Sequence, residues 1–177
     1  MIARAHTSEL DVATLAEIRD FLDAAYDGDF ADEDWEHALG GVHLQLREDG
    51  ELLGHACVVQ RRLVHRGTGI RTGYVEAVAV RGDRRRLGHG DALMAATEGI
   101  VSAAYDLGAL SAAEEARRLY TRRGWVPWGG ETWVLAPDGL RRTQDDDGGI
   151  LVLETPTSPE LDFGSGLACD WRPGDVW

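Results

Sequence analysis

The stretch Arg85-Arg86-Leu87-Gly88-His89-Gly90 says most about how this chain folds. It follows an apolar run at 75–80 and precedes a second apolar run, at 91–104, whose spacing is helical. The order predicts a strand, a basic turn with glycines, and a helix. N–H groups at a helix start point outward, and the helix dipole adds roughly half a positive charge there. Gly88 and Gly90 let an anion approach the backbone, where a side chain would block it. We therefore expect a phosphate-binding turn.

The turn does not fit the other common phosphate motifs. A dinucleotide site needs Gly-x-Gly-x-x-Gly, and a P-loop needs Gly-Lys-Ser/Thr at its end. The residues at 85–90 instead match Arg/Gln-x-x-Gly-x-Gly/Ala. This pattern resembles the pyrophosphate-binding signature of the GNAT acyl-coenzyme A N-acyltransferases.

Composition indicates an ordinary globular protein. The 177 residues suit a single domain, 1–177, with a real core, and 44% of them are hydrophobic and 28% charged. No apolar run approaches the ~18–20 residues that span a bilayer, and the N-terminus lacks an apolar signal region. We expect a cytoplasmic protein without a membrane partner.

The formal charge of −13 comes from 31 acidic and 18 basic residues, and the acids are clustered. One interpretation is solubility; the other is a cleft that concentrates a polycation. Nucleic acid is disfavoured as a partner because its phosphates demand the opposite sign. Basic residues gather at 81–86 and 117–123. One face thus suits a phosphorylated cofactor, and another a cationic substrate.

Periodicity and turn residues predict a mixed α/β sheet rather than a doubly wound one. Thr14 and Glu17 have capping-box spacing, and Asp49-Gly50 between apolar runs predicts a hairpin. The expected helices are 14–26, 32–39, 91–104 and 113–122, and the expected strands are 42–47, 52–64, 71–80, 107–111, 132–135 and 150–153.

A resemblance to the aminoglycoside 2′-N-acetyltransferases of mycobacteria and related actinobacteria extends over nearly the whole chain. The matching stretches are Gly28-Asp29-Phe30, Asp34-Trp35-Glu36-His37, Gly73-Tyr74-Val75-Glu76, Leu107-Gly108-Ala109-Leu110-Ser111, Ala116-Arg117-Arg118-Leu119-Tyr120, Arg123-Gly124-Trp125 and the nonapeptide 169–177. The resemblance implies a GNAT fold: a mixed, mostly antiparallel sheet with flanking helices and a strand–helix–strand cofactor crossover. It further implies acetyl transfer from acetyl-CoA to the 2′-amine of an aminoglycoside, antibiotic resistance and a homodimer. The turn glycines support coenzyme A binding but not this subfamily, whose members do not all keep them.

An amine attacks a thioester only as the free base, so an ammonium group must first lose a proton. Glu76 lies within an apolar strand run, where a carboxylate is costly unless it is exposed or has a task. The resemblance makes Glu76 the candidate general base, directly or through a water; the alternative is an outward-pointing strand residue. It suggests Tyr120 as the acid that protonates the coenzyme A thiolate, against packing on Trp125 as the alternative.

The resemblance also nominates binding residues. Contacts to coenzyme A are expected from Val78, Val80, Arg85, Arg86, Leu87, Gly88, His89 and Gly90, although either arginine can equally be a solvated surface residue. Contacts to the aminoglycoside are expected from Asp29, Asp34, Glu76, Ser111, Asp146, Asp175 and the terminal carboxylate of Trp177. The plainer interpretations are a helix cap for Asp29, a solvated helix face for Asp34, the end of a strand for Ser111, a turn for Asp146 and a disordered tail for the C-terminus.

Other chemistries find little support in the sequence. The six histidines form no His-x-x-x-His pair, so no metal site is expected, and no acyl-enzyme is expected on Cys57 or Cys169. Two alternatives stay open: a GNAT enzyme that acetylates an endogenous amine (an amino sugar, polyamine or peptide N-terminus), and a non-catalytic module that binds acyl-CoA or a cation.

Overall fold

The computed structural model describes residues 1–177 as two compact units. Unit 1 contains residues 1–59 and 75–100, and unit 2 contains residues 60–74 and 101–177. Strands β3 (Glu51–His65) and β4 (Thr68–Val80) and helix α3 (His89–Ala104) contribute residues to both units. None of the helices combines the length and apolar character needed to cross a membrane.

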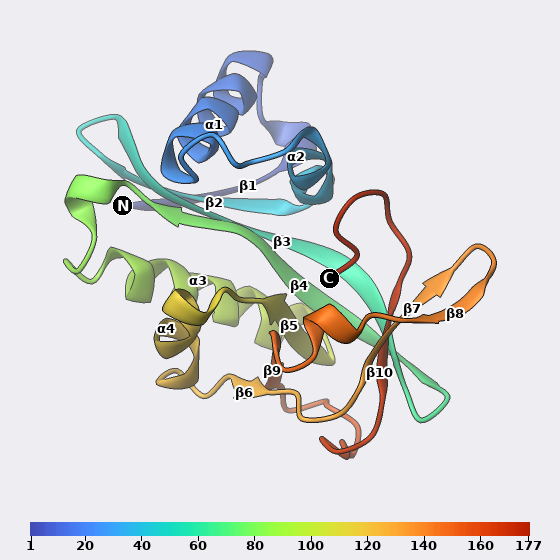
Figure 1. Ribbon diagram of the computed structural model, residues 1–177. Coiled ribbons are helices and arrows are strands. Elements are labelled where there is room, and N and C mark those ends of the chain that lie inside the picture. Colours follow the sequence, from blue (N-terminus) through green and yellow to red (C-terminus); the bar gives the residue numbers. More distant parts are fainter. The chain divides into compact units, whose positions relative to one another are not determined.

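Unit 1 is built on the antiparallel strands β1 (Ile2–His6), β2 (Val42–Glu48) and β3, in that order. Helices α1 (Val12–Ala25) and α2 (Asp32–Ala38) cover one face of these strands, and α3 covers the other (Figure 1). The predicted β2–β3 hairpin is confirmed. Its turn residues Asp49 and Gly50 have φ of 51° and 87°, the left-handed pair that a two-residue hairpin loop favours.

Helix α1 begins earlier than its sequence pattern predicts. The N-cap is Asp11, whose carboxylate accepts the N–H of Thr14 at 2.8 Å. Thr14 is therefore not the cap, and Glu17 forms an ion pair with Arg47 of β2 instead of completing a capping box. The expected box is wrong because aspartate at position 11 provides the better acceptor one turn earlier. Ile18 and Leu22 of the helix are fully buried in the core of unit 1.

Helix α3 packs closely on strand β3 at Gly54. A Cβ added to Gly54 would lie 2.8 Å from Cδ1 of Leu93 and 3.1 Å from the carbonyl oxygen of Ala79. Because a Cβ would crowd both the side chain of Leu93 and the main chain at Ala79, only glycine fits at position 54. The close approach thus lies in the first two turns of α3, just after the turn at 85–90.

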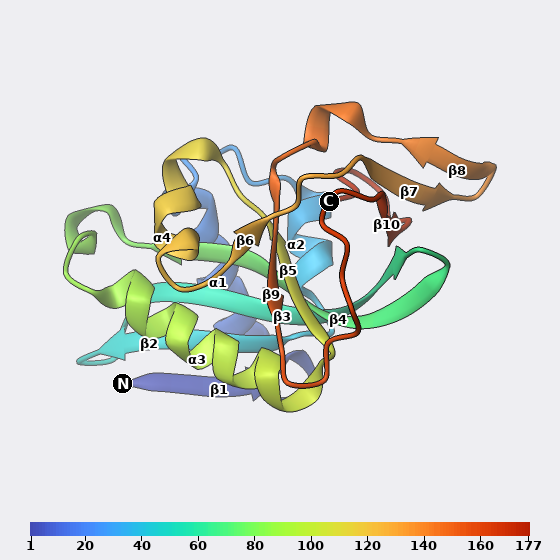
Figure 2. The same cartoon turned by 90° about the horizontal axis from the view of Figure 1, so that it is seen from below.

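Unit 2 holds strands in the order β6-β9-β5-β4-β3-β10-β7-β8. Strand β5 lies beside β9, which also pairs with β6 (Figure 2). The pairs β4–β5 and β10–β7 are parallel, and the other registers are antiparallel. Since β4, α3 and β5 follow one another along the chain, the predicted strand–helix–strand crossover is confirmed. The bounds are β5 Leu107–Ser111, β6 Val126–Pro127, β7 Thr132–Ala136, β8 Gly139–Arg142, β9 Ile150–Glu154 and β10 Leu167–Asp170.

The helix expected at 113–122 is broken in two. A 3-10 turn, η3 (Glu114–Ala116), precedes the short helix α4 (Arg117–Thr121), and Gly124 follows with φ of 94°. The sequence prediction also missed four short strands, β1, β6, β8 and β10, and three further 3-10 turns, η1 (Thr7–Glu9), η2 (Gly82–Arg84) and η4 (Gln144–Asp146).

Candidate active site

The turn at 85–90 has the backbone that an anion site requires. Arg86 and Gly88 are left-handed, with φ of 65° and 87°, and nothing lies within 4 Å of a Cβ built on Gly88. Helical hydrogen bonding starts at once, because the N–H of Ala92 bonds to the carbonyl of Gly88 at 3.0 Å. Leu87 is 63% exposed, so the turn is open to solvent at the N-terminus of α3. The residues present therefore fit a phosphate group.

The two arginines of the turn differ in their contacts. Arg85 donates from Nε to the carbonyl of Val80 at 3.1 Å and from its terminal nitrogen to the carbonyl of Ala25 at 3.3 Å. Both arginines are exposed, and Arg85 ties the turn to β4 and α1 through these two bonds. The sequence alone gave no reason to distinguish the two arginines.

Glu76 lies in β4 and is half-buried. Its exposure alone does not decide between the role of base and that of an outward-pointing strand residue. Tyr26, which was not among the predicted site residues, lies near Glu76, and its pKa responds to that carboxylate. Desolvation, followed by the negative charges of Glu76 and Asp34, raises the pKa of Tyr26 to about 12, while Arg85 opposes the shift. The structure therefore brings three of the predicted residues, Glu76, Asp34 and Arg85, close to one tyrosine.

Two aspartates were nominated as substrate ligands in unit 1. Asp34 accepts the main-chain N–H of Ala31 at 2.9 Å, and so stabilises the first turn of α2. Asp29 is exposed in the turn after α1, where its N–H bonds to the carbonyl of Tyr26 at 3.0 Å. The helix-capping role expected of Asp29 thus falls to Asp34.

In unit 2, Tyr120 is buried on α4, 6% exposed. Its ring meets that of Trp125 edge to face, with the centroids 6.2 Å apart. The packing contact is therefore real, and it leaves the role of the hydroxyl group open. Ser111 is the last residue of β5 and is exposed.

The C-terminus is ordered rather than frayed. Trp177 is 3% exposed; its main-chain N–H bonds to Oδ1 of Asp175 at 3.2 Å, and its indole N–H bonds to Oγ1 of Thr143 at 2.9 Å. Burial, followed by the negative charge of Asp175, raises the pKa of Asp146. Three of the predicted residues, Asp146, Asp175 and Trp177, therefore lie close together.

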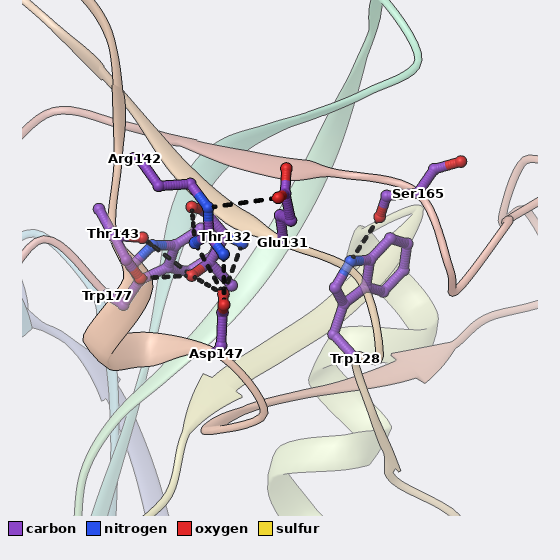
Figure 3. Close-up of polar contacts among 8 residues, drawn as sticks. All are labelled: Trp128, Glu131, Thr132, Arg142, Thr143, Asp147, Ser165 and Trp177. Atoms are coloured by element: carbon purple, nitrogen blue, oxygen red, sulfur yellow. Dashed lines mark hydrogen bonds and ion pairs between the residues drawn. The ribbon is translucent and has the colours of Figure 1, made fainter.

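Hydrogen bonds beneath the C-terminal tryptophan hold this acidic loop (Figure 3). Thr143 donates to Oγ1 of Thr132 at 2.9 Å, and Thr132 donates to Asp147 through both its N–H and its hydroxyl, each at 2.9 Å. Arg142 pairs with the same carboxylate. These contacts, that of Arg142 first, hold the pKa of Asp147 well below its usual range. Asp147 is thus a neutralised structural carboxylate.

The two cysteines are buried free thiols. Desolvation raises the pKa of Cys169 to about 11 and also raises that of Cys57, where the charge of Glu76 adds to the effect. Both sulfurs stay protonated near neutral pH, so neither is an activated nucleophile.

A buried histidine pair was also missed by the sequence analysis. Nδ1 of His43 lies 3.0 Å from Nε2 of His55, and both side chains are fully buried. His43 belongs to β2 and His55 to β3, so their spacing along the chain shows no pattern. Only the strand register brings them together.

Comparison with known proteins places this geometry in a class. The sequence model of the acetyltransferase (GNAT) family matches residues 11–125. The chain therefore belongs to the GNAT family, a class of acetyltransferases.

The chain is most informatively compared with an aminoglycoside 2′-N-acetyltransferase of Mycolicibacterium fortuitum. The two are 52% identical over 174 residues, which cover 97% of this chain and 89% of that protein.

Solved structures share the fold at low identity. Escherichia coli ElaA superposes with a TM-score of 0.62 at 18% identity, covering 87% of this chain and 99% of its own. A GNAT family acetyltransferase from Brucella melitensis, in complex with acetyl-CoA, gives a TM-score of 0.59 at 18% identity and covers 98% of this chain and 97% of its own. These likenesses show the α/β fold of the family.

The histidine pair predicts how stability depends on pH. Burial lowers the pKa of His43 to about 4 and that of His55 to about 3, whereas both titrate near 6.5 in the unfolded chain. The unfolded state therefore binds up to two more protons as the pH falls from 6.5 towards 4. The free energy of unfolding should drop in this window by up to ~2.7 kcal/mol per pH unit.

Urea unfolding at intervals of half a pH unit between 7.5 and 5 measures this slope before most carboxylates titrate. The double variant His43→Gln, His55→Gln should show a much shallower slope. Equal slopes in the two proteins would contradict the assignment.

Proposed function

We propose that this enzyme transfers the acetyl group of acetyl-CoA to the 2′-amine of an aminoglycoside, and thereby confers resistance. The observation that carries the proposal is the 52% identity, over 97% of the chain, to an aminoglycoside 2′-N-acetyltransferase. Identity at this level over nearly the full length supports a shared reaction as well as a shared fold. We further propose that the chain acts as a single domain, in the cytoplasm and as a homodimer, without nucleic acid or membrane partners.

Acetyl-CoA fits the residues of the 85–90 turn. The left-handed backbone at Gly88 and the exposed start of α3 suit the pyrophosphate, and Arg86 adds positive charge. The carbonyls of Val78 and Val80 accept hydrogen bonds from Tyr26 and Arg85. Each carbonyl oxygen has a second lone pair, and we keep Val78 and Val80 as main-chain contacts of the cofactor. When bound, acetyl-CoA supplies the activated thioester.

Glu76 is proposed as the general base. It removes a proton from the substrate ammonium group, directly or through a water, so that the neutral nitrogen attacks the acetyl carbonyl. A C–N bond forms and the C–S bond breaks. Tyr120 gives its proton to the departing thiolate. The attacking nitrogen loses its second proton as the C–S bond breaks, and that proton restores the hydroxyl of Tyr120 through solvent. Direct transfer of this kind needs no acylated side chain, which agrees with the raised pKa values of both cysteines.

The substrate ligands are proposed to be mainly carboxylates, because an aminoglycoside carries several ammonium groups. We assign this role to Asp29, Asp34, Glu76, Ser111, Asp146, Asp175 and the carboxylate of Trp177. Among the consecutive aspartates of the acidic loop, Asp146 is the best candidate. Its charge is partly desolvated and has a negative neighbour in Asp175, so a cationic ligand would relieve an unfavourable interaction.

The position of acetylation provides the test of the proposal. Kanamycin A and kanamycin B differ at C2′, which carries a hydroxyl group in the first and an amine in the second. We expect acetylation of kanamycin B only, seen as one added acetyl group by mass spectrometry and located at N2′ by NMR. Acetylation of kanamycin A on another amine would refute the 2′ position. Turnover confined to polyamines or peptides would favour an endogenous substrate. The absence of turnover with every amine would favour a non-catalytic binding module.

Replacing Glu76 tests the base. Glu76→Gln keeps the size of the side chain but cannot take up a proton, so kcat should fall by about 10²–10⁴-fold with the fold intact. Steady-state kinetics with kanamycin B and circular dichroism measure the two effects. Glu154→Gln, at the exposed end of β9, is the matched control and should keep full activity. Full activity of Glu76→Gln would remove Glu76 from the mechanism.

Adjacent aspartates allow a matched test of substrate binding. Asp146→Asn removes a partly buried charge and should raise the KM for the aminoglycoside about tenfold or more, since hydrogen bonds to charged groups contribute ~1.5–3 kcal/mol. Asp145→Asn removes an exposed charge one residue away and should have little effect. The KM for acetyl-CoA should stay constant in both variants. Equal effects of the two changes would point to long-range charge alone.

A further inference from the structure

The buried pair His43–His55 belongs to a chain of hydrogen bonds in unit 1. Oγ1 of Thr7 lies 2.9 Å from Nε2 of His43, Nδ1 of His43 lies 3.0 Å from Nε2 of His55, and Nδ1 of His55 lies 2.9 Å from the carbonyl oxygen of Ala77. The N–H of Gly40 donates to Thr7 at the other end, at 2.9 Å. Buried imidazoles are costly unless their nitrogens are bonded, and here all four ring nitrogens have partners.

The acceptor at the end of this chain fixes the position of every proton. A carbonyl oxygen only accepts, so Nδ1 of His55 carries its hydrogen, and Nε2 of the same neutral ring accepts from Nδ1 of His43. The hydroxyl of Thr7 has two acceptors within reach, Nε2 of His43 at 2.9 Å and the carbonyl oxygen of Gly41 at 3.2 Å. With His43 neutral, we assign the hydroxyl hydrogen to the nearer acceptor, Nε2 of His43. This assignment takes both rings as neutral, on the ground of their lowered pKa values. The series of bonds therefore points one way, towards Ala77.

Ala77, at the end of this chain of hydrogen bonds, has an unusual backbone conformation. Its φ is +50°, within strand β4 and directly after Glu76. A residue with a Cβ pays ~1–2 kcal/mol for left-handed backbone, so surrounding contacts must hold it there. Side chains bind both carbonyls that follow Glu76: His55 binds that of Ala77, and the hydroxyl of Tyr26 binds that of Val78 at 3.1 Å.

This backbone decides where Glu76 points. Successive side chains of a regular strand alternate between the two faces, and a left-handed residue breaks the alternation and turns its neighbours. We infer that His55 is a positioning residue, which holds the left-handed backbone at Ala77 and thereby aims the carboxylate of Glu76 at the substrate amine. The inference rests on the proposed role of Glu76 as the base.

Two variants separate the donor from the bulk of the ring. His55→Leu keeps an apolar side chain but removes the donor to Ala77; kcat should fall about 10²-fold, the cost of a misplacement of ~1 Å, with both KM values nearly unchanged. His55→Asn keeps an N–H near the position of Nδ1 and should recover much of kcat. Leu44→Ala, a fully buried change on β2, should lower stability without this loss of kcat.

A double-mutant cycle then links His55 to Glu76. If His55 acts through Glu76, adding His55→Leu to Glu76→Gln should lower kcat no further. Independent, multiplying losses would overturn the inference, as would a His55→Leu enzyme with normal kcat.

The backbone itself can be followed without catalysis. The ¹³Cβ shift of Ala77 reports its φ, and it should leave the left-handed value in His55→Leu and keep it in Leu44→Ala. An unchanged shift in His55→Leu would overturn the inference while leaving Glu76 as the base. Full activity of Glu76→Gln would instead refute the proposed base, and the positioning role with it.

Discussion

A left-handed residue inside strand β4 is the constraint on which the polar interior of unit 1 depends. Ala77 has a Cβ, so its φ of +50° carries a cost that neighbouring groups must offset. His55 and Tyr26 bind successive carbonyls after Glu76, and Arg85 binds the carbonyl of Val80 two residues later. Side chains from β3, α1 and the turn before α3 thus meet on one strand segment. The strand segment that follows Glu76 is tied to β3 and α1, and the turn at 85–90 is tied to β4, by side-chain hydrogen bonds.

In unit 2, neighbouring carboxylates that contribute equally to the net charge have different environments. Asp147 is bonded by Arg142 and Thr132 and has a lowered pKa, whereas its neighbour Asp146 has a raised one. The carboxylate of Asp147 stabilises the loop. The carboxylate of Asp146 lies near another negative charge, so a cation bound there would be favourable. Adjacent aspartates of one run therefore differ in their electrostatic environment.

Local signals were predicted well. The Asp49-Gly50 hairpin, the strand at 107–111 and the crossover from β4 through α3 to β5 depend on residues close in the chain, and all three are confirmed. The start of α1 was misplaced because two capping residues competed over one turn of sequence. Strand β10 was missed because its four residues have no periodicity of their own, and only pairing with β3 and β7 makes them a strand.

The sequence by itself determined the resemblance to the family, the glycine-containing turn before a helix and the set of candidate site residues. These follow from contiguous motifs and from local backbone preferences, which survive in a linear string. Only the tertiary structure decided which of those residues are engaged: that Arg85 rather than Arg86 ties the turn to the strand, that Asp147 is neutralised, and that His43 and His55 form a pair behind Ala77. The physical reason is that desolvation and hydrogen bonding depend on groups brought together from distant segments, which chain order does not reveal.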